Sequence, residues 1–191
     1  ASDWSSDVCS SDLFWTDESG PDYGGGLWTE LYGNLPIWNL GYGFDRTQNL
    51  LWRIANGELE GQAPALLVVN IGTNQFSISE RYDGDTPEDA AAGIHCVLRT
   101  LHEKFPAALI LVMALFPRGG KLPEISGTNR LLREMAGAMP FAKLIDLTQK
   151  LGDAEGNPVP RFYQPDLCHI NRAGYEIWAE AIAPYLRPFA G

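Results

Sequence analysis

Cysteine and long apolar runs are both scarce in this chain of 191 residues. Its three cysteines are Cys9, Cys96 and Cys168, an odd number without the spacing of metal ligands. That pattern argues against a disulfide framework and against a cysteine-ligated metal centre. No apolar run approaches the roughly 20 residues that a membrane-spanning helix needs, so we expect no membrane span.

Basic residues are also few. The 14 lysines and arginines stand against 24 aspartates and glutamates, which gives a formal net charge of −10. Nucleic acids and anionic membranes both bind basic surfaces, so this balance argues against either of them as a partner. The remaining composition is ordinary for a globular enzyme, with 45% hydrophobic residues in a length that suits one domain with a sizeable core.

Apolar runs and helical periodicities alternate along the chain from Phe14 onward. Two near-continuous apolar runs, 65–71 and 108–115, are typical of strands that are buried on both faces of a parallel sheet. We predict further strands at 36–40 and 142–147, and helices at 27–32, 46–56, 88–104 and 125–136, with a closing helix after Asn171. The alternation predicts right-handed βαβ crossovers and a parallel sheet that helices cover on both faces.

In such sheets a ligand binds outside the carboxyl ends of the strands. The loops that leave those ends are 41–45, 72–75 and 116–120, and the loop Asp166-Leu167-Cys168-His169 follows the last strand after an insertion. An acid three residues before a histidine can orient the imidazole and stabilise its protonated form, as a general base for a hydroxyl nucleophile requires. The alternative is a loop histidine that only caps or packs.

Three segments, in this order, resemble one known family. They are N-L-G-Y-G-F-D-R-T-Q-N-L-L-W-R at 39–53, I-G-T-N at 71–74 and D-L-C-H at 166–169. Together they resemble the SGNH (GDSL-type) hydrolases, and most closely the branch of the platelet-activating-factor acetylhydrolase catalytic subunits and their bacterial esterase relatives. The resemblance implies a flavodoxin-like, three-layer α/β/α fold, with residues 14–191 as a single domain.

The resemblance also implies roles for several residues. Asp166 and His169 match the acid and base of the family, and Asn74 matches the asparagine whose amide donates to the oxyanion. A neutral amide suits that role because it donates without titrating, and each preorganised donor stabilises the intermediate by roughly 3–4 kcal/mol. From the residues alone, Asn74 could equally be a turn residue that caps its own backbone. The family uses a serine nucleophile and no metal, so we expect no cofactor.

The chain departs from the family pattern at two places. Phe44 stands where the family has an oxyanion glycine, and because phenylalanine avoids positive φ, the second donor is the backbone N–H of either Gly43 or Phe44. The Gly-Asp-Ser block that ends the first strand of the family is absent. Ser10 falls where the nucleophile should be, and Ser11 is its nearby competitor. We therefore predict that the first strand is missing or degraded.

Residues 1–13 differ in character from the rest. Ser-Ser-Asp occurs at 5–7 and again at 10–12, without the hydrophobic period of a strand or helix. One interpretation is an irregular, solvated leader. The other is that V-C-S-S-D-L at 8–13 is a translated sequencing adapter, which would make this end an artefact on a truncated gene. The alternative to a nucleophilic Ser10 is therefore a solvated or artefactual serine.

Three residues near these loops carry weaker expectations. Cys168 is an alternative nucleophile, which we disfavour because its place between acid and base points it away from the base. Arg118 is expected to brace a loop and not to contact substrate. Asp45 is expected to form a charge pair with Arg46 at the start of a helix.

The sequence thus predicts a serine hydrolase of short-chain esters, acetyl esters above all, of a lipid, sugar or aryl alcohol. Ser10 would attack, His169 would take and return the proton, and Asp166 would orient His169. The alternatives are a thioesterase or lysophospholipase of the same family, and a non-catalytic binding or scaffold domain. Members of the resembling branch include dimers, so a homodimer is one of the assemblies that the resemblance allows.

Overall fold

Helices and strands alternate along the chain as the periodicity predicts. The computed structural model describes residues 6–9, 23–24, 26–33, 35, 37–78 and 83–189. The helices and strands in these ranges are β1 (Ser6–Cys9), α1 (Leu27–Tyr32), β2 (Trp38–Asn39), α2 (Thr47–Ala55), β3 (Leu66–Asn70), the 3₁₀ helix η3 (Thr73–Phe76), α3 (Pro87–Lys104), β4 (Leu109–Met113), α4 (Leu122–Ala136), β5 (Ala142–Ile145), α5 (Thr148–Leu151), η4 (Pro160–Phe162), α6 (Arg172–Leu186) and η5 (Arg187–Phe189).

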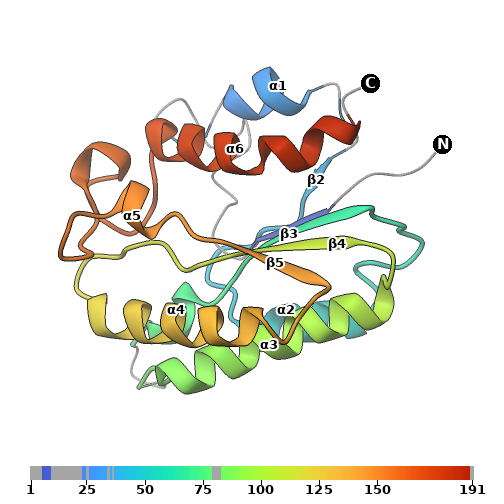
Figure 1. Ribbon diagram of the computed structural model, residues 1–191, viewed down its shortest axis with the longest axis horizontal. Coiled ribbons are helices and arrows are strands. Elements are labelled where there is room, and N and C mark those ends of the chain that lie inside the picture. The colour runs from blue at the N-terminus through green and yellow to red at the C-terminus, as the bar shows by residue number, and fades with distance from the viewer. Residues whose placement is uncertain are drawn as a thin grey trace.

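The strands form one parallel sheet in the order β2-β1-β3-β4-β5 (Figure 1). This is the strand order of flavodoxin-like folds, so the predicted α/β class is confirmed. The chain runs outward from β1 to β2 and then returns past β1 to β3. The order therefore reverses between β1 and β3, which is the place in such a sheet where ligands bind.

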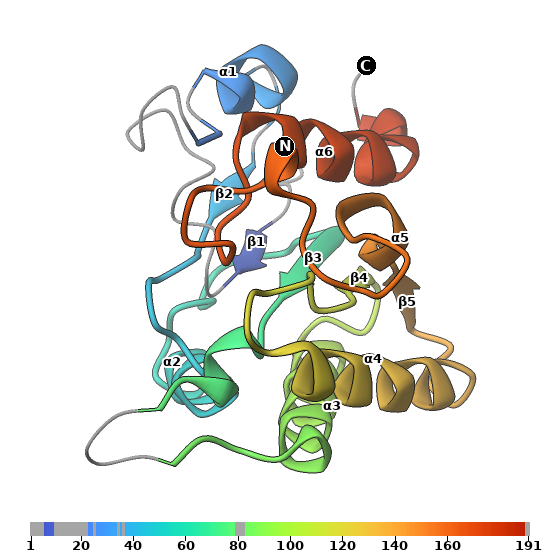
Figure 2. The same cartoon turned by 90° about the vertical axis from the view of Figure 1, so that its left-hand side faces the viewer.

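Helices cover the sheet on both faces, which gives three layers (Figure 2). Helices α1 and α6 lie on one side, and α2, α3 and α4 lie on the other. β3 shows how the sequence builds both cores, because alternate side chains of a strand point to opposite faces. Leu67 and Val69 belong to the cluster that includes residues of α2, α3 and α4, whereas Leu66 and Val68 pack in the cluster around Trp178 of α6.

The first strand, predicted to be missing or degraded, is present as a short strand. Ser6–Cys9 forms β1 inside the sheet, paired with β2 on one side and β3 on the other. The segment is too short to show a hydrophobic period, and its position depends on backbone pairing with both neighbours. Ser10 and Ser11 lie outside the described residues, as do 1–5 and 12–13. The division of the chain at residue 13 stays a prediction.

Side-chain caps fix where two helices begin. Thr86 Oγ1 accepts a hydrogen bond from the backbone of Asp89 at 3.1 Å, and Pro87 stands in the first turn of α3. Asn171 caps α6 by accepting from the backbone N–H of Gly174 at 3.2 Å, so this helix begins directly after Asn171, as predicted. This cap places His169 immediately before α6. No helix within the described ranges has the length and apolar composition to cross a membrane.

Candidate active site

The loop that carries Asp166 and His169 closes on itself. Tyr163 and Ile170 form an antiparallel bridge at its base. Inside that bridge the backbone N–H of Gln164 donates to the carbonyl of His169 at 2.8 Å. The four residues 166–169 are thereby held between a bridge on one side and the capped start of α6 on the other.

The side chains of Asp166 and His169 are in contact, as the sequence predicts. His169 Nδ1 lies 2.6 Å from Asp166 Oδ2. The other carboxylate oxygen, Oδ1, accepts from the backbone N–H groups of Cys168 at 2.9 Å and His169 at 3.0 Å. With Nδ1 donating to the carboxylate, Nε2 is the ring nitrogen that can accept a proton.

The hydrogen bonds around Asp166 keep its carboxyl group ionised. Partial burial raises the pKa of Asp166, but the hydrogen bonds from the His169 ring and from the two backbone N–H groups outweigh it and hold the pKa below its usual value. The Asp166 side chain is 48% exposed, so its contact with His169 is screened by solvent and adds little to stability.

Asn74 follows β3 in η3, at the carboxyl edge of the sheet. The turn into η3 depends on Gly72, which has φ 121° and whose added Cβ would lie 2.9 Å from Ile94 Cδ1. The Asn74 amide Nδ2 donates to the backbone carbonyl of Asp45 at 3.1 Å. That bond uses one of the two amide hydrogens and joins the loop after β3 to the loop 41–45.

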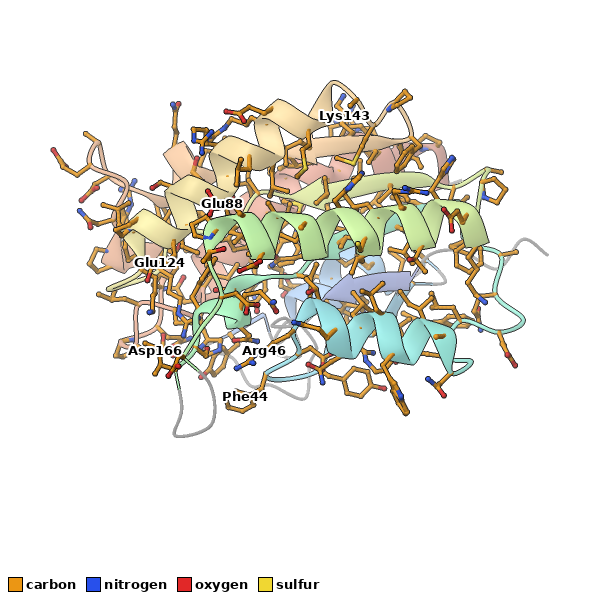
Figure 3. The ribbon with its side chains drawn as sticks, turned by 90° about the horizontal axis from the view of Figure 1, so that it is seen from below. Phe44, Arg46, Glu88, Glu124, Lys143 and Asp166 are labelled. Carbon is orange, nitrogen blue, oxygen red and sulfur yellow. The ribbon has the colours of Figure 1, made fainter. Side chains whose placement is uncertain are left out.

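Phe44 adopts a backbone conformation that the sequence argues against. Its φ is 65°, in the left-handed region that costs a non-glycine residue about 1–2 kcal/mol. The side chain is 89% exposed, so packing does not offset this cost. Gly43, the other candidate, has ordinary φ. Figure 3 shows Phe44 and Asp166 at the same edge of the molecule, beyond the ends of α2 and α3.

One cavity of about 170 Å³ brings the predicted residues together. Gly43, Phe44, Asn74 and His169 all line it, and Asp166 reaches it through His169. Several other lining residues were not predicted, because they flank the motifs and no sequence pattern marks them as site residues: Thr73, Ser77, Phe116, Ile170 and Tyr175.

Arg118 braces the loops, as predicted. Its Nη1 donates to the carbonyl of Thr73 at 2.9 Å, and the next residue, Gly119, donates its N–H to the carbonyl of Leu167 at 2.8 Å. These bonds join the loop after β4 to η3 and to the loop 166–169. The cavity therefore has walls from loops that lie far apart in the sequence.

Cys168 lines the same cavity but is a poor nucleophile. Burial raises the pKa of its thiol, the charge of Arg118 lowers it, and the charge of Asp166 raises it, with a net increase. Because only the thiolate attacks, a raised pKa disfavours the thiol alternative.

Asp45 does not serve as a helix-start charge. Its carboxylate forms an ion pair with Arg53, and the two side chains are only 12% and 14% exposed. This pair was not predicted, because Arg46 is adjacent to Asp45 in the sequence, whereas Arg53 comes near Asp45 only after α2 has formed.

The model of the GDSL-like lipase/acylhydrolase family matches residues 3–177. The chain belongs to this family. The match includes β1 and the loops around the cavity. The predicted resemblance is confirmed, and with it the place of this chain among esterases and acylhydrolases.

Relatives in sequence include acetylhydrolase subunits. Platelet-activating factor acetylhydrolase IB subunit alpha1 of Bos taurus is 33% identical over 153 residues, which cover 78% of this chain and 62% of the relative. Subunit alpha2 of Gallus gallus is also 33% identical, with coverage of 78% and 63%. The matched part of this chain thus spans less than two thirds of these relatives.

Solved structures share the fold at low sequence identity. A GDSL-like lipase from Bacteroides thetaiotaomicron is 15% identical with a TM-score of 0.77, covering 97% of this chain and 89% of the other. An acetyl xylan esterase, also 15% identical, has a TM-score of 0.70 and coverage of 95% and 98%. At these identities the likeness supports the fold alone.

Proposed function

We propose that this protein hydrolyses small carboxylic esters, with a preference for acetyl groups, through a Ser-His-Asp acyl-enzyme mechanism. The observation that carries the proposal is the 2.6 Å contact between Asp166 and His169 beside a cavity that Asn74 and Phe44 also line. An acid, a base and hydrogen-bond donors around one small space are what acyl transfer requires.

Ser10 is the proposed nucleophile. It follows Cys9, the last residue of β1, and Cys9 pairs with Asn70 at the end of β3. β1 and β3 flank the point where the strand order reverses, and Asn74 follows β3. The chain order thus supports a nucleophilic serine directly after an inner strand whose last residue pairs with the last residue of β3.

Two neutral donors are proposed for the oxyanion. One is the second amide hydrogen of Asn74, and the other is the backbone N–H of Phe44. The left-handed φ of Phe44 supports it over Gly43, because this is the conformation that a glycine would adopt at the same position. A strained residue at a cavity is often one whose backbone direction matters for function.

The proposed steps follow from these positions. Ser10 Oγ attacks the ester carbonyl while His169 Nε2 takes the hydroxyl proton, and Asp166 stabilises the imidazolium. The tetrahedral intermediate collapses as His169 gives the proton to the leaving alcohol, which leaves an acyl-serine. A water molecule then attacks the acyl carbon and gives its proton to His169, and the carboxylic acid leaves as Ser10 regains the proton.

The preference for a short acyl group rests on cavity size. At about 170 Å³ the space is smaller than the 300–1,000 Å³ that is typical of sites for larger ligands. The names of two similar proteins, a platelet-activating factor acetylhydrolase subunit and an acetyl xylan esterase, point to acetyl esters as well. Their different alcohols leave a lipid, sugar or aryl alcohol as the proposed leaving group.

Hydrolysis of p-nitrophenyl acetate tests the proposal, with intact-mass analysis after treatment with a fluorophosphonate. We expect turnover, a single adduct that maps to Ser10, and loss of both in Ser10→Ala. Ser11→Ala is the matched control and should retain both. An adduct on Ser11 would move the nucleophile by one residue. A folded protein with neither turnover nor adduct would overturn the proposal and favour a binding domain.

The acyl preference needs a second comparison. We expect kcat/KM for p-nitrophenyl acetate to exceed that for p-nitrophenyl octanoate, because the longer chain does not fit the cavity. Equal or faster hydrolysis of octanoate would favour a lysophospholipase. Faster turnover of an acetyl thioester than of the matched oxygen ester would favour a thioesterase.

A further inference from the structure

A buried arginine lies between two carboxylates beside the candidate site. Arg53 Nη2 contacts Asp45 Oδ2, and Nη1 lies 2.5 Å from Glu58 Oε1. The three side chains are only 12–15% exposed. Removing three charges from water is costly, and ion pairing offsets that cost only when the remaining polar atoms are also satisfied.

This network is not fully satisfied. Arg53 Nε and Glu58 Oε2 are buried, and neither has a hydrogen-bond partner among the described residues. Each buried polar atom without a partner lowers stability, because it has lost its hydrogen bonds to water and gained none in the protein. Stability alone is therefore a weak reason for an arginine at this position, and the contacts of its guanidinium suggest another.

The guanidinium contacts the loop 41–45 at its start, middle and end. Nη1 donates to the carbonyl of Leu40 at 3.3 Å, the group lies 4.2 Å from the centre of the Tyr42 ring, and Nη2 donates to Asp45. Between these anchors the loop has little packing of its own. Phe44 is 89% exposed, and a Cβ added to Gly43 would meet nothing within 4 Å.

Asp45 connects Arg53 to Asn74, the other proposed donor. Its side chain is held by Arg53, and its backbone carbonyl accepts from Asn74 Nδ2 at 3.1 Å. A displacement of Asp45 therefore moves both the loop that carries the Phe44 N–H and the amide of Asn74. The same two segments are also joined next to this bond, where Gln75 of η3 accepts from the backbone N–H of Thr47 at 3.1 Å and donates to Gln48 Oε1 at 3.3 Å. Asp45 is the link between them that Arg53 holds.

We propose that Arg53 is a positioning residue, which fixes the Phe44 N–H and the Asn74 amide relative to each other through Asp45. The assignment of an oxyanion role to these two donors rests on the function proposed above. The geometric link between Arg53, Asp45 and Asn74 does not, and it can be measured by itself.

Arg53→Lys is the first test, because it keeps the charge and removes the planar fork that reaches several partners. We expect kcat for p-nitrophenyl acetate to fall about 10- to 100-fold with KM changed less than about twofold, since oxyanion donors act mainly on the transition state. Arg133→Lys is the matched control, because Arg133 also forms a two-nitrogen ion pair, with Asp146 on the surface. It should leave kcat unchanged.

Glu58→Gln separates positioning from a general loss of the buried network. It removes one ion pair of Arg53 but leaves the contacts to Leu40, Tyr42 and Asp45 in place. We expect kcat within about threefold of the parent, which is small beside the loss of a donor. A loss in Glu58→Gln as large as that in Arg53→Lys would overturn the proposal, as would an unchanged kcat in Arg53→Lys. If Arg53→Lys does not fold, Asp45→Asn takes its place, with the same expected loss in kcat and an unchanged kcat again overturning the proposal.

Amide ¹H–¹⁵N spectra test the link without reference to activity. Arg53→Lys, or Asp45→Asn if it replaces that variant, should shift the side-chain amide of Asn74 and the backbone amide of Phe44, whereas Arg133→Lys should shift neither. If the parent has no esterase activity but these shifts occur, the proposed function fails and the positioning role stands. Unshifted Asn74 and Phe44 signals in a folded variant would overturn the positioning role whatever the activity.

Discussion

The loop that carries Asp166 and His169 faces the same cavity as the loops 41–45 and 73–76, but different contacts hold them. Asp166 and His169 are three residues apart, the hydrogen bonds between them are local, and Asp166 is 48% exposed. The loops 41–45 and 73–76 depend on contacts between distant segments. The bond from Asn74 to Asp45 spans 29 positions, and the bond from Arg118 to Thr73 spans 45.

Because of this difference, substitutions in the two regions should affect activity and stability to different degrees. A local, exposed contact adds little to stability, so its loss should affect activity and leave the fold intact. Contacts between distant segments depend on the packed sheet and its helices, so changes there should affect stability, activity or both. The following predictions test that separation, from the largest expected effect to the smallest.

His169→Ala should remove activity without destabilising the protein. We expect kcat/KM for p-nitrophenyl acetate to fall about 10⁴-fold or more, as for the loss of a triad histidine. The free energy of unfolding should change by less than about 0.5 kcal/mol, because the side chain is one-third exposed. Enzyme assays and thermal melts measure the two effects. His95→Ala, a half-buried histidine on α3, is the control; equal losses in both variants would contradict the assignment.

Gly72→Ala should lower the stability of the protein. The new Cβ would lie 2.9 Å from Ile94 Cδ1, in a backbone conformation with φ 121°. We expect a loss of about 2 kcal/mol in unfolding free energy, measured by urea denaturation. Gly43→Ala is the matched control, because its Cβ would meet nothing within 4 Å and its φ is ordinary. Similar losses in the two variants would show that the conformation at Gly72 is not the cause.

Phe44→Gly should stabilise the protein although it removes a large side chain. Glycine adopts φ 65° without strain, and we expect a gain of about 0.5–1 kcal/mol after the extra entropy of the unfolded chain is included. The backbone N–H remains, so activity on acetyl esters should persist. Ile78→Gly, at a similarly exposed loop position with ordinary φ, should instead lose stability. A loss of stability in Phe44→Gly as well would rule out strain at this position.

The smallest effect concerns acid stability. The pKa of Asp166 is lower in the folded state than its ordinary value, so the ionised group stabilises the fold above its unfolded-state pKa. That contribution is lost as the pH falls through the lowered, folded-state pKa. Because Asp166 is about half exposed, we expect less than about 0.5 kcal/mol. Urea midpoints of the parent and Asp166→Asn, compared at pH 3 and pH 6, should converge at the lower pH; a constant difference would contradict this linkage.

Features that depend on local contacts could be predicted from the sequence, and features that depend on contacts between distant segments could not. The apolar runs around β3 and β4 specify strands that are buried on both faces, and alternation with helices then determines a parallel sheet. Asp166 and His169 could be paired because they share one loop. Asn74 could be placed because it directly follows a predicted strand.

Two features could not be predicted, because they depend on tertiary context. β1 is four residues long and its place in the sheet comes from backbone pairing with β2 and β3, which no periodicity records. Phe44 adopts a conformation that local preference disfavours, within a loop that Arg53 holds from α2. The pairing of Arg53 with Asp45 likewise requires the turn of a helix to bring two distant charges together.

The place of β1 also bears on how the chain is made. Ser6 pairs with both Trp38 and Leu67, so an inner strand of the sheet is synthesised before either of its neighbours. On the ribosome β1 must therefore wait for β3, and until then the pair of β1 and β2 has no further strand to join. Parallel pairing between such distant segments is slow, and exposed strand edges promote aggregation. We therefore expect nascent chains that stop before residue 66 to depend on chaperones, and chains that extend past residue 113 to collapse around β3 and β4.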